Sequence, residues 1–196
     1  MVRQIEIPFK EKAKLPAITP AGYEMGTSTK SLISFKDEFV ITDLSTDTVY
    51  SYSPDQGLQP FIVRSPSIHS MNSPEVYLSP LFMSDRYYFM RTEKMDISTW
   101  TTLESLLLGL PTKDLVYDTK DKIVYEYKLY NADITNKAEV EFDRRFDGEI
   151  IFMQSLDAYK LVEYYKKGEL KGRLKEIAAG LNEEDNPVIM LVKQKY

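Results

Sequence analysis

The sequence predicts a mostly β chain: a partial β-propeller of about three four-stranded antiparallel blades, with a C-terminal helix pair. Short runs rich in Val, Ile, Thr, Tyr and Phe recur along the chain between turn residues, which is typical of strands in a pleated sheet. From residue 155 onward the apolar spacing becomes that of a helix. Repeated four-stranded units with loops at their joints favour a propeller. A β-sandwich with a helical appendage is the alternative.

The first predicted unit is a four-stranded meander that ends near Arg64. Its strands are Ser31–Phe35, Glu38–Asp43, Thr48–Ser53 and Leu58–Arg64. The turn Pro54–Gly57 separates the last two, because Pro54 presets the backbone and Gly57 can adopt a positive φ. Upstream, we expect a lone strand at Val2–Phe9 and a loop at Lys10–Thr27.

A second unit follows a turn-rich segment. Its predicted strands are Val76–Met83, Arg86–Thr92, Lys113–Asp118 and Ile123–Tyr130. Laying Val49–Tyr50 over Val116–Tyr117 aligns a tyrosine-bearing hairpin in each unit. The offset of 67 residues, 116 minus 49, exceeds an ordinary blade of about 40–50 residues. The insertion Glu93–Pro111 accounts for the excess.

A third, partial unit precedes the helical tail. It has predicted strands at Ala138–Asp143 and Glu149–Met153, linked around Asp147–Gly148. The first helix is expected to begin at an N-cap, Ser155, and to end at Gly168. Its predicted apolar face is Leu156, Tyr159, Val162 and Tyr165, and that of the second helix is Leu170, Leu174, Ile177, Ala178 and Leu181.

The segment Asn182–Pro187 stops the second helix, and Val188–Val192 is predicted to be a short buried strand. We therefore expect residues 1–196 to form a single domain. The helix pair, residues 155–182, would pack on the partial propeller, and the final strand would cover residues 188–193.

Composition excludes several classes of function. The chain has 196 residues, 43% of them hydrophobic, and no cysteine, so disulfides, thiolate nucleophiles and cysteine zinc sites are excluded. The net charge of −5, without a cluster of Lys and Arg, argues against a nucleic-acid partner. No apolar run has the length of a transmembrane segment, and no signal peptide is readable in this sequence.

The polar candidates favour structural roles, so we predict no catalytic residue, no metal site and no cofactor. The single histidine, His69, has no partner at a spacing that suggests a general base. Asp43, Asp47, Asp114, Asp118 and Asp121 flank turns that we take to correspond between the two units. They could bind calcium, but carboxylates at turns more commonly accept backbone hydrogen bonds. No phosphate-binding glycine motif is present.

Three aromatic residues are the candidate ligand-binding residues. Trp100 lies in the insertion among Ser and Thr residues, where it could stack on a sugar ring or fasten the insertion to its blade. Tyr87 and Tyr88 are adjacent, so they face opposite sides of a regular strand. The remaining strand tyrosines are explained by packing between blades.

Three segments carry a resemblance to a known family. They are TSTKSLISFKDEFVITDLSTDTVYSY (27–52), KDLVYD (113–118) and AYKLVEYYKKGELKGRLKEIAAGLNEEDNPVIMLVK (158–193). They resemble the C-terminal half of the six-bladed β-propeller proteins, often lipoproteins, of Bacteroides-type bacteria. The resemblance implies a cell-envelope location, in the periplasm or as an outer-membrane lipoprotein, and further blades upstream in a longer chain. It supplies no catalytic residues to carry over.

The predicted function is a non-enzymatic scaffold that binds a protein, a peptide or a glycan. The alternative is a hydrolase or lyase-type propeller enzyme whose site is completed by missing blades. A third interpretation is a remnant without independent activity. Because too few blades are present to close a ring, we also expect exposed blade faces and possible self-association.

Overall fold

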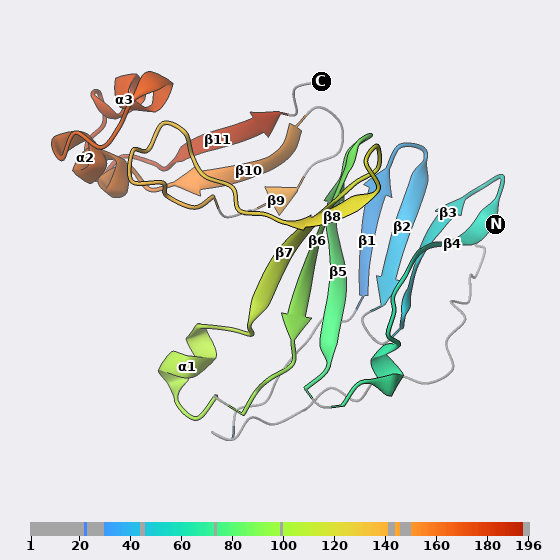
Figure 1. Cartoon of the computed structure of the whole chain (residues 1–196). Helices are drawn as coiled ribbons and strands as arrows, with labels where there is room; N and C mark the ends of the chain where they lie inside the picture. Colours follow the sequence, from blue (N-terminus) through green and yellow to red (C-terminus); the bar gives the residue numbers. More distant parts are fainter. Residues whose placement is uncertain are drawn as a thin grey trace. The chain divides into compact units, whose positions relative to one another are not determined.

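The computed structural model describes residues 22, 30–43, 46–72, 74–98, 100–140, 144–145 and 150–193. The chain divides into two compact units, residues 1–126 and 127–196, where the sequence suggests one domain (Figure 1). The sheets are antiparallel and the helices are few, which confirms the mostly β prediction. The predicted strand Val2–Phe9 and all of the predicted loop 10–27 except Gly22 lie outside the described residues.

The first sheet is a four-stranded meander in the order β1-β2-β3-β4, as predicted. Its strands are β1 (Lys30–Phe35), β2 (Glu38–Asp43), β3 (Thr48–Ser53) and β4 (Gly57–Val63). Gly57 has a φ of 69°, a left-handed conformation that costs a glycine nothing. This residue lets the chain reverse between β3 and β4.

The second sheet repeats this order as β5-β6-β7-β8. Its strands are β5 (Val76–Met83), β6 (Tyr87–Lys94), β7 (Thr112–Asp118) and β8 (Ile123–Glu126). Val49–Tyr50 and Val116–Tyr117 both lie on the third strand of their sheet, β3 and β7, as their alignment implies. Strand β8 is shorter than predicted, because residues 127–129 leave the sheet.

Both four-stranded sheets belong to the first compact unit, residues 1–126, and they contact each other through aromatic rings. Tyr88 of β6 lies 5.8 Å from the ring of Phe35 in an edge-on arrangement and 5.3 Å from the ring of Phe61. Tyr117, beside it on β7, is 5.8 Å away. Aromatic pairs at these distances are favourable beyond their buried area. Tyr88 therefore joins β6 to both outer strands of the first sheet.

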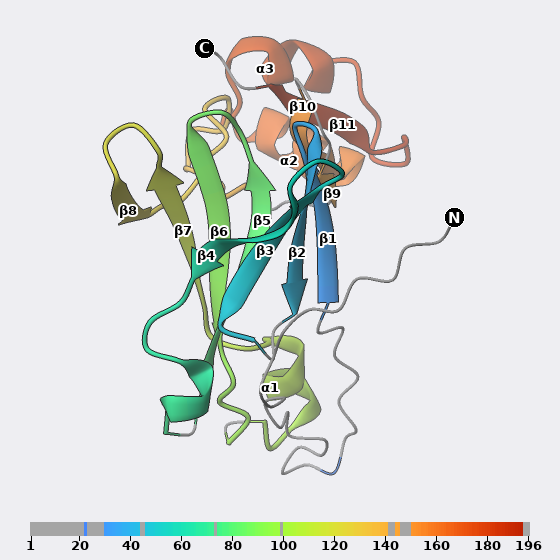
Figure 2. The ribbon, with the colours of Figure 1, turned by 90° about the vertical axis from the view of Figure 1, so that its right-hand side faces the viewer.

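A small core closes one end of the second sheet. The helical turn η1 (Ile68–Ser70) precedes β5, and α1 (Leu103–Leu107) separates β6 from β7, so both lie at this end (Figures 1 and 2). Ile68 of η1, Tyr77 of β5 and Met95 after β6 form this buried core, with Ile97 and Leu110 packed against them. The base of the insertion thus belongs to the core of the sheet.

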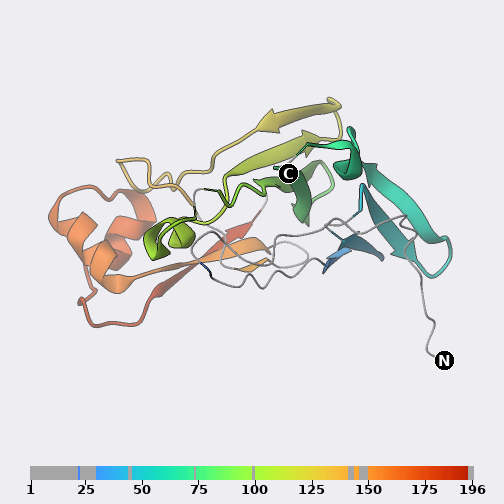
Figure 3. The same cartoon turned by 90° about the horizontal axis from the view of Figure 1, so that it is seen from below.

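The second compact unit, residues 127–196, combines a three-stranded sheet with two helices. The sheet order is β11-β10-β9, with β9 (Arg144–Arg145), β10 (Ile150–Leu156) and β11 (Val188–Lys193). Helices α2 (Ala158–Lys166) and α3 (Gly172–Ala178) lie together at one end of β10 and β11 (Figure 3). Their shared core consists of Ile134, Leu161, Leu170, Leu174 and Ala178.

The start of this unit differs from the predicted strand Ala138–Asp143. Residues 129–140, the 129–140 loop, turn back on themselves through hydrogen bonds from Asn131 N to Ala138 O and from Val140 N to Leu129 O. A single bridge joins Tyr130 to Glu139. Residues 141–143 and the predicted turn Asp147–Gly148 lie outside the described residues.

Helix α2 begins later than predicted. Ser155 is not its N-cap but part of β10, and the N-cap position is Asp157, whose side chain makes no capping hydrogen bond. The buried face is Ala158, Leu161 and Val162, whereas Tyr159 and Tyr165 of the predicted face are 52% and 40% exposed. Aliphatic side chains take the interior because a tyrosine can leave its hydroxyl in water. The predicted end at Gly168 is confirmed, since its φ is 70°.

Strand β11 matches the predicted residues 188–193 but is not the buried strand that the sequence suggests. Its residues alternate between half-buried and exposed, and Ile189 and Leu191 are each 52% exposed. Within the described part of the chain the strand pairs with β10 alone and so forms an edge of the sheet. One side of the strand packs near the helices, as Val188 does, and the other does not.

Asp133 of the 129–140 loop caps helix α3 from outside the helix. Its Oδ2 accepts a hydrogen bond of 3.1 Å from the backbone N–H of Leu174, while its carbonyl accepts one from Lys171 N. A carboxylate at this place satisfies a donor that the helix leaves unpaired. Gly172 makes this approach possible, because a Cβ built there would lie 2.5 Å from Asp133 Oδ1 and the φ of Gly172 is 57°.

We predict that Gly172→Ala lowers the free energy of unfolding by about 1–3 kcal/mol, the usual cost of a non-glycine residue held in a sparsely populated backbone conformation. The matched control is Gly180→Ala, where the nearest atom would be 3.8 Å away and φ is not positive. Urea denaturation monitored by circular dichroism measures both. Equal stabilities of the two variants would contradict the role of Asp133 and Gly172.

Candidate functional site

Trp100 fastens the insertion rather than presenting an open ring. It is 6% exposed, and its Nε1 donates a hydrogen bond of 3.2 Å to the carbonyl of Gly109. The same segment is closed by a capping box between Thr102 and Ser105 at the start of α1. A ring so covered offers no face on which a sugar could stack.

Tyr87 and Tyr88 have different surroundings. Tyr88 packs among the aromatic rings between the sheets, and burial raises the pKa of its hydroxyl. Tyr87 lies 5.0 Å from the guanidinium of Arg86 and 6.2 Å from the ring of Phe89. The structure therefore does not bring Trp100, Tyr87 and Tyr88 together into one site.

The acidic candidates each have a structural partner. Asp47 accepts hydrogen bonds from the Ser67 hydroxyl and the Ile68 backbone N–H, which ties the β2–β3 turn to η1. Asp114 forms an ion pair with Arg91 at 2.6 Å. His69 lies in η1. Within the described ranges, no three His, Asp or Glu side chains converge as metal ligands do.

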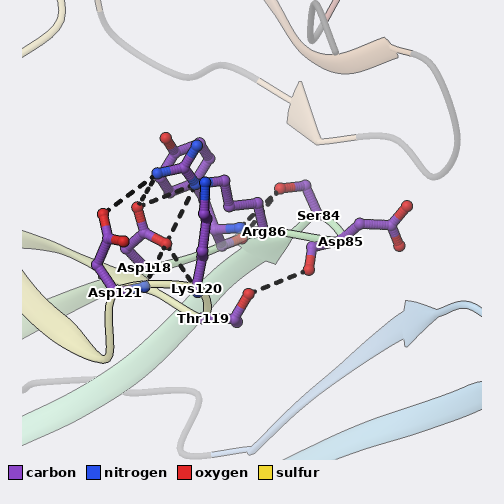
Figure 4. A network of polar contacts seen from close by, with 8 residues as sticks. Ser84, Asp85, Arg86, Asp118, Thr119, Lys120 and Asp121 are labelled. Atoms are coloured by element: carbon purple, nitrogen blue, oxygen red, sulfur yellow. Dashed lines mark hydrogen bonds and ion pairs between the residues drawn. The ribbon is translucent and has the colours of Figure 1, made fainter.

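The strongest polar network joins two turns of the second sheet (Figure 4). Arg86, in the β5–β6 turn, donates hydrogen bonds to both oxygens of Asp118 at 2.7–3.2 Å, and its guanidinium also lies 3.4 Å from Asp121. Asp118 Oδ1 accepts further bonds from the backbone N–H groups of Lys120 and Asp121. Thr119 completes the link through Asp85 O and Arg86 O.

These contacts fix the ionisation of Asp118. The Arg86 hydrogen bonds, helped by the backbone N–H groups, hold the pKa of its carboxyl at about 2. Its side chain is only 4% exposed. Strongly shifted groups often mark functional sites, but ion-pair networks that hold turns together shift pKa values too. The Asp118 carboxylate holds two turns together, because it accepts hydrogen bonds from Arg86 in the β5–β6 turn and from Lys120 and Asp121 in the β7–β8 turn.

The two aspartate-flanked turns that the sequence pairs between the two sheets do not correspond in the structure. Asp118 and Asp121 flank the β7–β8 turn, whereas Asp43 and Asp47 flank the β2–β3 turn, so these turns do not correspond. With the offset of 67 residues, the partner of Asp47 is Asp114, just as Val49 matches Val116. The β7–β8 turn corresponds to Pro54–Gly57.

The second unit contains a cleft of about 240 Å³. It lies between the 129–140 loop, the end of β10 and the first half of α2. Its lining residues are Asn131, Ile134, Ala138, Glu139, Gln154, Ser155, Leu156, Asp157, Lys160, Leu161 and Tyr164. The half-buried Ala138, Leu156 and Tyr164 contribute apolar surface, and the exposed Glu139 and Lys160 contribute charge at the rim.

The charges at the rim are paired. Lys160 Nζ lies 3.0 Å from Asp157 Oδ2, and Glu139 lies 3.1 Å from Lys128 Nζ. The hydrogen bond to Asp157 raises the pKa of Lys160. Lys160 therefore stays protonated at neutral pH and can only donate hydrogen bonds.

Sequence reasoning did not find this cleft. Its lining residues come from two segments, 131–139 and 154–164, and no motif links them. One usable signal is the spacing of Ala158, Leu161 and Val162, which identifies the buried face of α2 and hence the side on which Lys160 and Tyr164 lie. The Asn131–Asp133 pair, typical of a turn, is another: Asp133 N donates to Asn131 Oδ1 at 2.9 Å.

No protein-family model matches the chain, and no curated protein matches it. Among solved structures, the chain is similar to the crystal structure of a Bacteroides fragilis protein inferred to be exported, with a TM-score of 0.51 and 16% identity. The match covers 89% of this chain and 55% of that one, so this chain spans about half of its length. At this identity the likeness shows the fold alone. No helix in the described part of the chain is long and apolar enough to cross a bilayer.

We predict that Tyr88→Ala lowers the free energy of unfolding by about 2–3 kcal/mol, since it removes a partly buried aromatic ring between the sheets. Tyr88→Phe keeps the ring and should cost less than about 1 kcal/mol. Tyr125→Ala, at a 46% exposed position on β8, is a further control. Equal losses for Tyr88→Ala and Tyr125→Ala in urea denaturation would show that the sheets do not depend on this contact.

We predict that Asp118→Asn reduces stability at pH 7 and changes its pH dependence. The folded pKa of about 2 lies below the ordinary value near 3.9. The stabilisation by this carboxylate is therefore present above about pH 4 and is lost as the pH falls towards 2. The urea midpoint of the native protein should fall more steeply over that range than that of Asp118→Asn. Asp121→Asn, half-exposed, is the control and should retain the native slope.

Proposed function

We propose that this chain is a non-enzymatic binding protein of the bacterial cell envelope, built on propeller-type blades, with its ligand in the cleft of residues 127–196. The blade assignment is supported by two successive four-stranded meanders with matching third strands. Their contact at Tyr88 is the face-to-face packing that neighbouring blades require. The third sheet would be a partial blade.

The envelope location is supported by the fold of the Bacteroides fragilis protein, which is inferred to be exported. The resemblance of residues 27–52, 113–118 and 158–193 to envelope propellers points the same way. Because this chain spans about half of that protein's length, blades outside this chain would complete the ring.

The observation that supports binding is the pairing of charges in the cleft, where Lys160 Nζ lies 3.0 Å from Asp157 Oδ2 and Glu139 Oε1 lies 3.1 Å from Lys128 Nζ. A general base at neutral pH needs a pKa near the working pH. The hydrogen bond to Asp157 shifts the pKa of Lys160 in the opposite direction, upward. Together with Gln154 and Asn131, Lys160 gives the cleft hydrogen-bonding groups that orient a ligand, as binding pockets do.

We predict that a screen of small polar molecules (amino acids, neutral monosaccharides and inorganic phosphate) yields at least one that shifts the backbone amide signals of residues 154–160 in NMR spectra of the full chain. The ligand should be recovered chemically unchanged after incubation. Ser155→Trp, which places a bulky ring on the exposed rim, should abolish the shifts.

Ala132→Trp is the matched control, because Ala132 is exposed in the same unit but does not line the cleft. Shifts that survive in Ser155→Trp would place the binding site elsewhere. Chemical conversion of a bound probe would replace the binding function with an enzymatic one.

A further inference from the structure

We propose that the cleft takes a neutral, polyhydroxylated ligand of about the size of one sugar ring. This inference rests on the proposed binding function and deepens it by naming the ligand class. It stands on three features of the cleft: the presence of both apolar and polar side chains in its lining, the pairing of its charges, and its size.

The lining suits a ring that has one apolar and one polar side. The accessible apolar lining is Ala138, Leu156 and Tyr164, which are half-buried and pack against the core that contains Ile134 and Leu161. Amide, hydroxyl and charged side chains complete the lining. A sugar ring presents C–H groups on its faces and hydroxyls at its edge, and aromatic and aliphatic side chains pack against such faces.

The charge pairing favours a neutral ligand. Lys160 is matched by Asp157 and Glu139 by Lys128, so the rim has no unmatched charge among these four groups. A charged ligand would have to compete with an existing ion pair. A hydroxyl does not have to break an ion pair in order to bind. A carboxylate has about four acceptor positions and an ammonium has three donors, and each ion pair leaves some of them free for a ligand.

The polar side chains of the cleft include both hydrogen-bond donors and hydrogen-bond acceptors. Gln154 and Asn131 offer amide donors and acceptors, Lys160 donates, and Glu139 and Asp157 accept. A hydroxyl donates and accepts at once, so a vicinal pair of hydroxyls suits neighbouring groups of opposite kind. This mixture matches hydroxyls better than it matches a ligand that only accepts, such as phosphate.

The size and rigidity of the cleft limit the ligand further. Its volume of about 240 Å³ lies below the roughly 300–1,000 Å³ typical of pockets for drug-sized ligands, so one small ring is the natural occupant. Asn131 is held in place, since its Oδ1 accepts from Asp133 N and its Nδ2 contacts Met190 Sδ at 3.4 Å. A preformed wall reduces the ordering cost of binding.

The test is saturation-transfer NMR on the full chain with ring compounds that differ in charge. Glucose, galactose and mannose are the neutral probes, glucuronic acid is the anionic one, and glucosamine is the cationic one. We expect at least one neutral sugar to bind about tenfold more tightly than both charged probes. Lys160→Met and Gln154→Met should each weaken the binding of this sugar about tenfold. This is the effect of losing one hydrogen bond between the ligand and a charged or polar side chain.

Lys166→Met is the matched control. Lys166 lies on the same helix, pairs with Glu183 at 2.7 Å and does not line the cleft, so affinity should be unchanged. Circular dichroism confirms that each variant is folded, and two independent cleft variants keep the test valid if one is not.

The outcomes separate the ligand class from the binding function. Tighter binding of glucuronic acid that is lost in Lys160→Met, or of glucosamine that is lost in Gln154→Met, would overturn the neutral ligand and leave the binding cleft standing. Binding of an amino acid or phosphate in the amide-shift screen, with no signal from any sugar, would do the same. Neutral sugar binding that Lys160→Met, Gln154→Met and Lys166→Met all leave unchanged would overturn both, as would the absence of any ligand in both experiments.

Discussion

A four-stranded antiparallel sheet has two faces, and the apolar residues on each must be covered by something other than water. In the first unit this constraint is met where Tyr88 packs against Phe35 and Phe61 of the neighbouring sheet. Strong local hairpins alone would leave both faces open. Strands β1 and β5 also contact each other, and just beyond their ends Lys36 Nζ lies 3.2 Å from Asp85 Oδ1.

The second unit depends on a different device, the attachment of the 129–140 loop to the connection between α2 and α3. Thr135 N donates to Glu169 O, Lys171 N donates to Asp133 O, and Ile134 forms a bridge with Leu170. These contacts hold together two segments that are more than 30 residues apart in the sequence, the 129–140 loop and the connection between α2 and α3. Because Ile134 lies in the core and also lines the cleft, folding and the shape of the cleft are coupled.

Much of the fold follows from local patterns in the sequence, and most of the site does not. Runs of strand-forming residues separated by turn residues, such as Pro54 and Gly57, indicate β1 to β7, because a strand and its turn are encoded within a few positions of each other. The sequence predicts both helices and the buried face of α3, but on α2 it places the exposed Tyr159 and Tyr165 in the buried face and omits Ala158 and Leu161. The edge position of β11 depends on which strands lie beside it, which no pattern within residues 188–193 reveals. The cleft requires the meeting of Asn131, Gln154 and Lys160, and their spacing carries no signal until the helices are packed.

The insertion between β6 and β7 has a base and a tip with different tolerance to change. Its base is closed by the hydrogen bond from Lys94 N to Pro111 O, and Met95 and Leu110 there belong to a core. Its tip carries Leu107 and Leu108, which are 79% and 82% exposed, on a helix that Thr102 and Ser105 cap without outside help. Evolution can therefore lengthen, shorten or exchange the tip without disturbing the sheet. The same property makes residues 101–108 a place to graft a foreign epitope or tag.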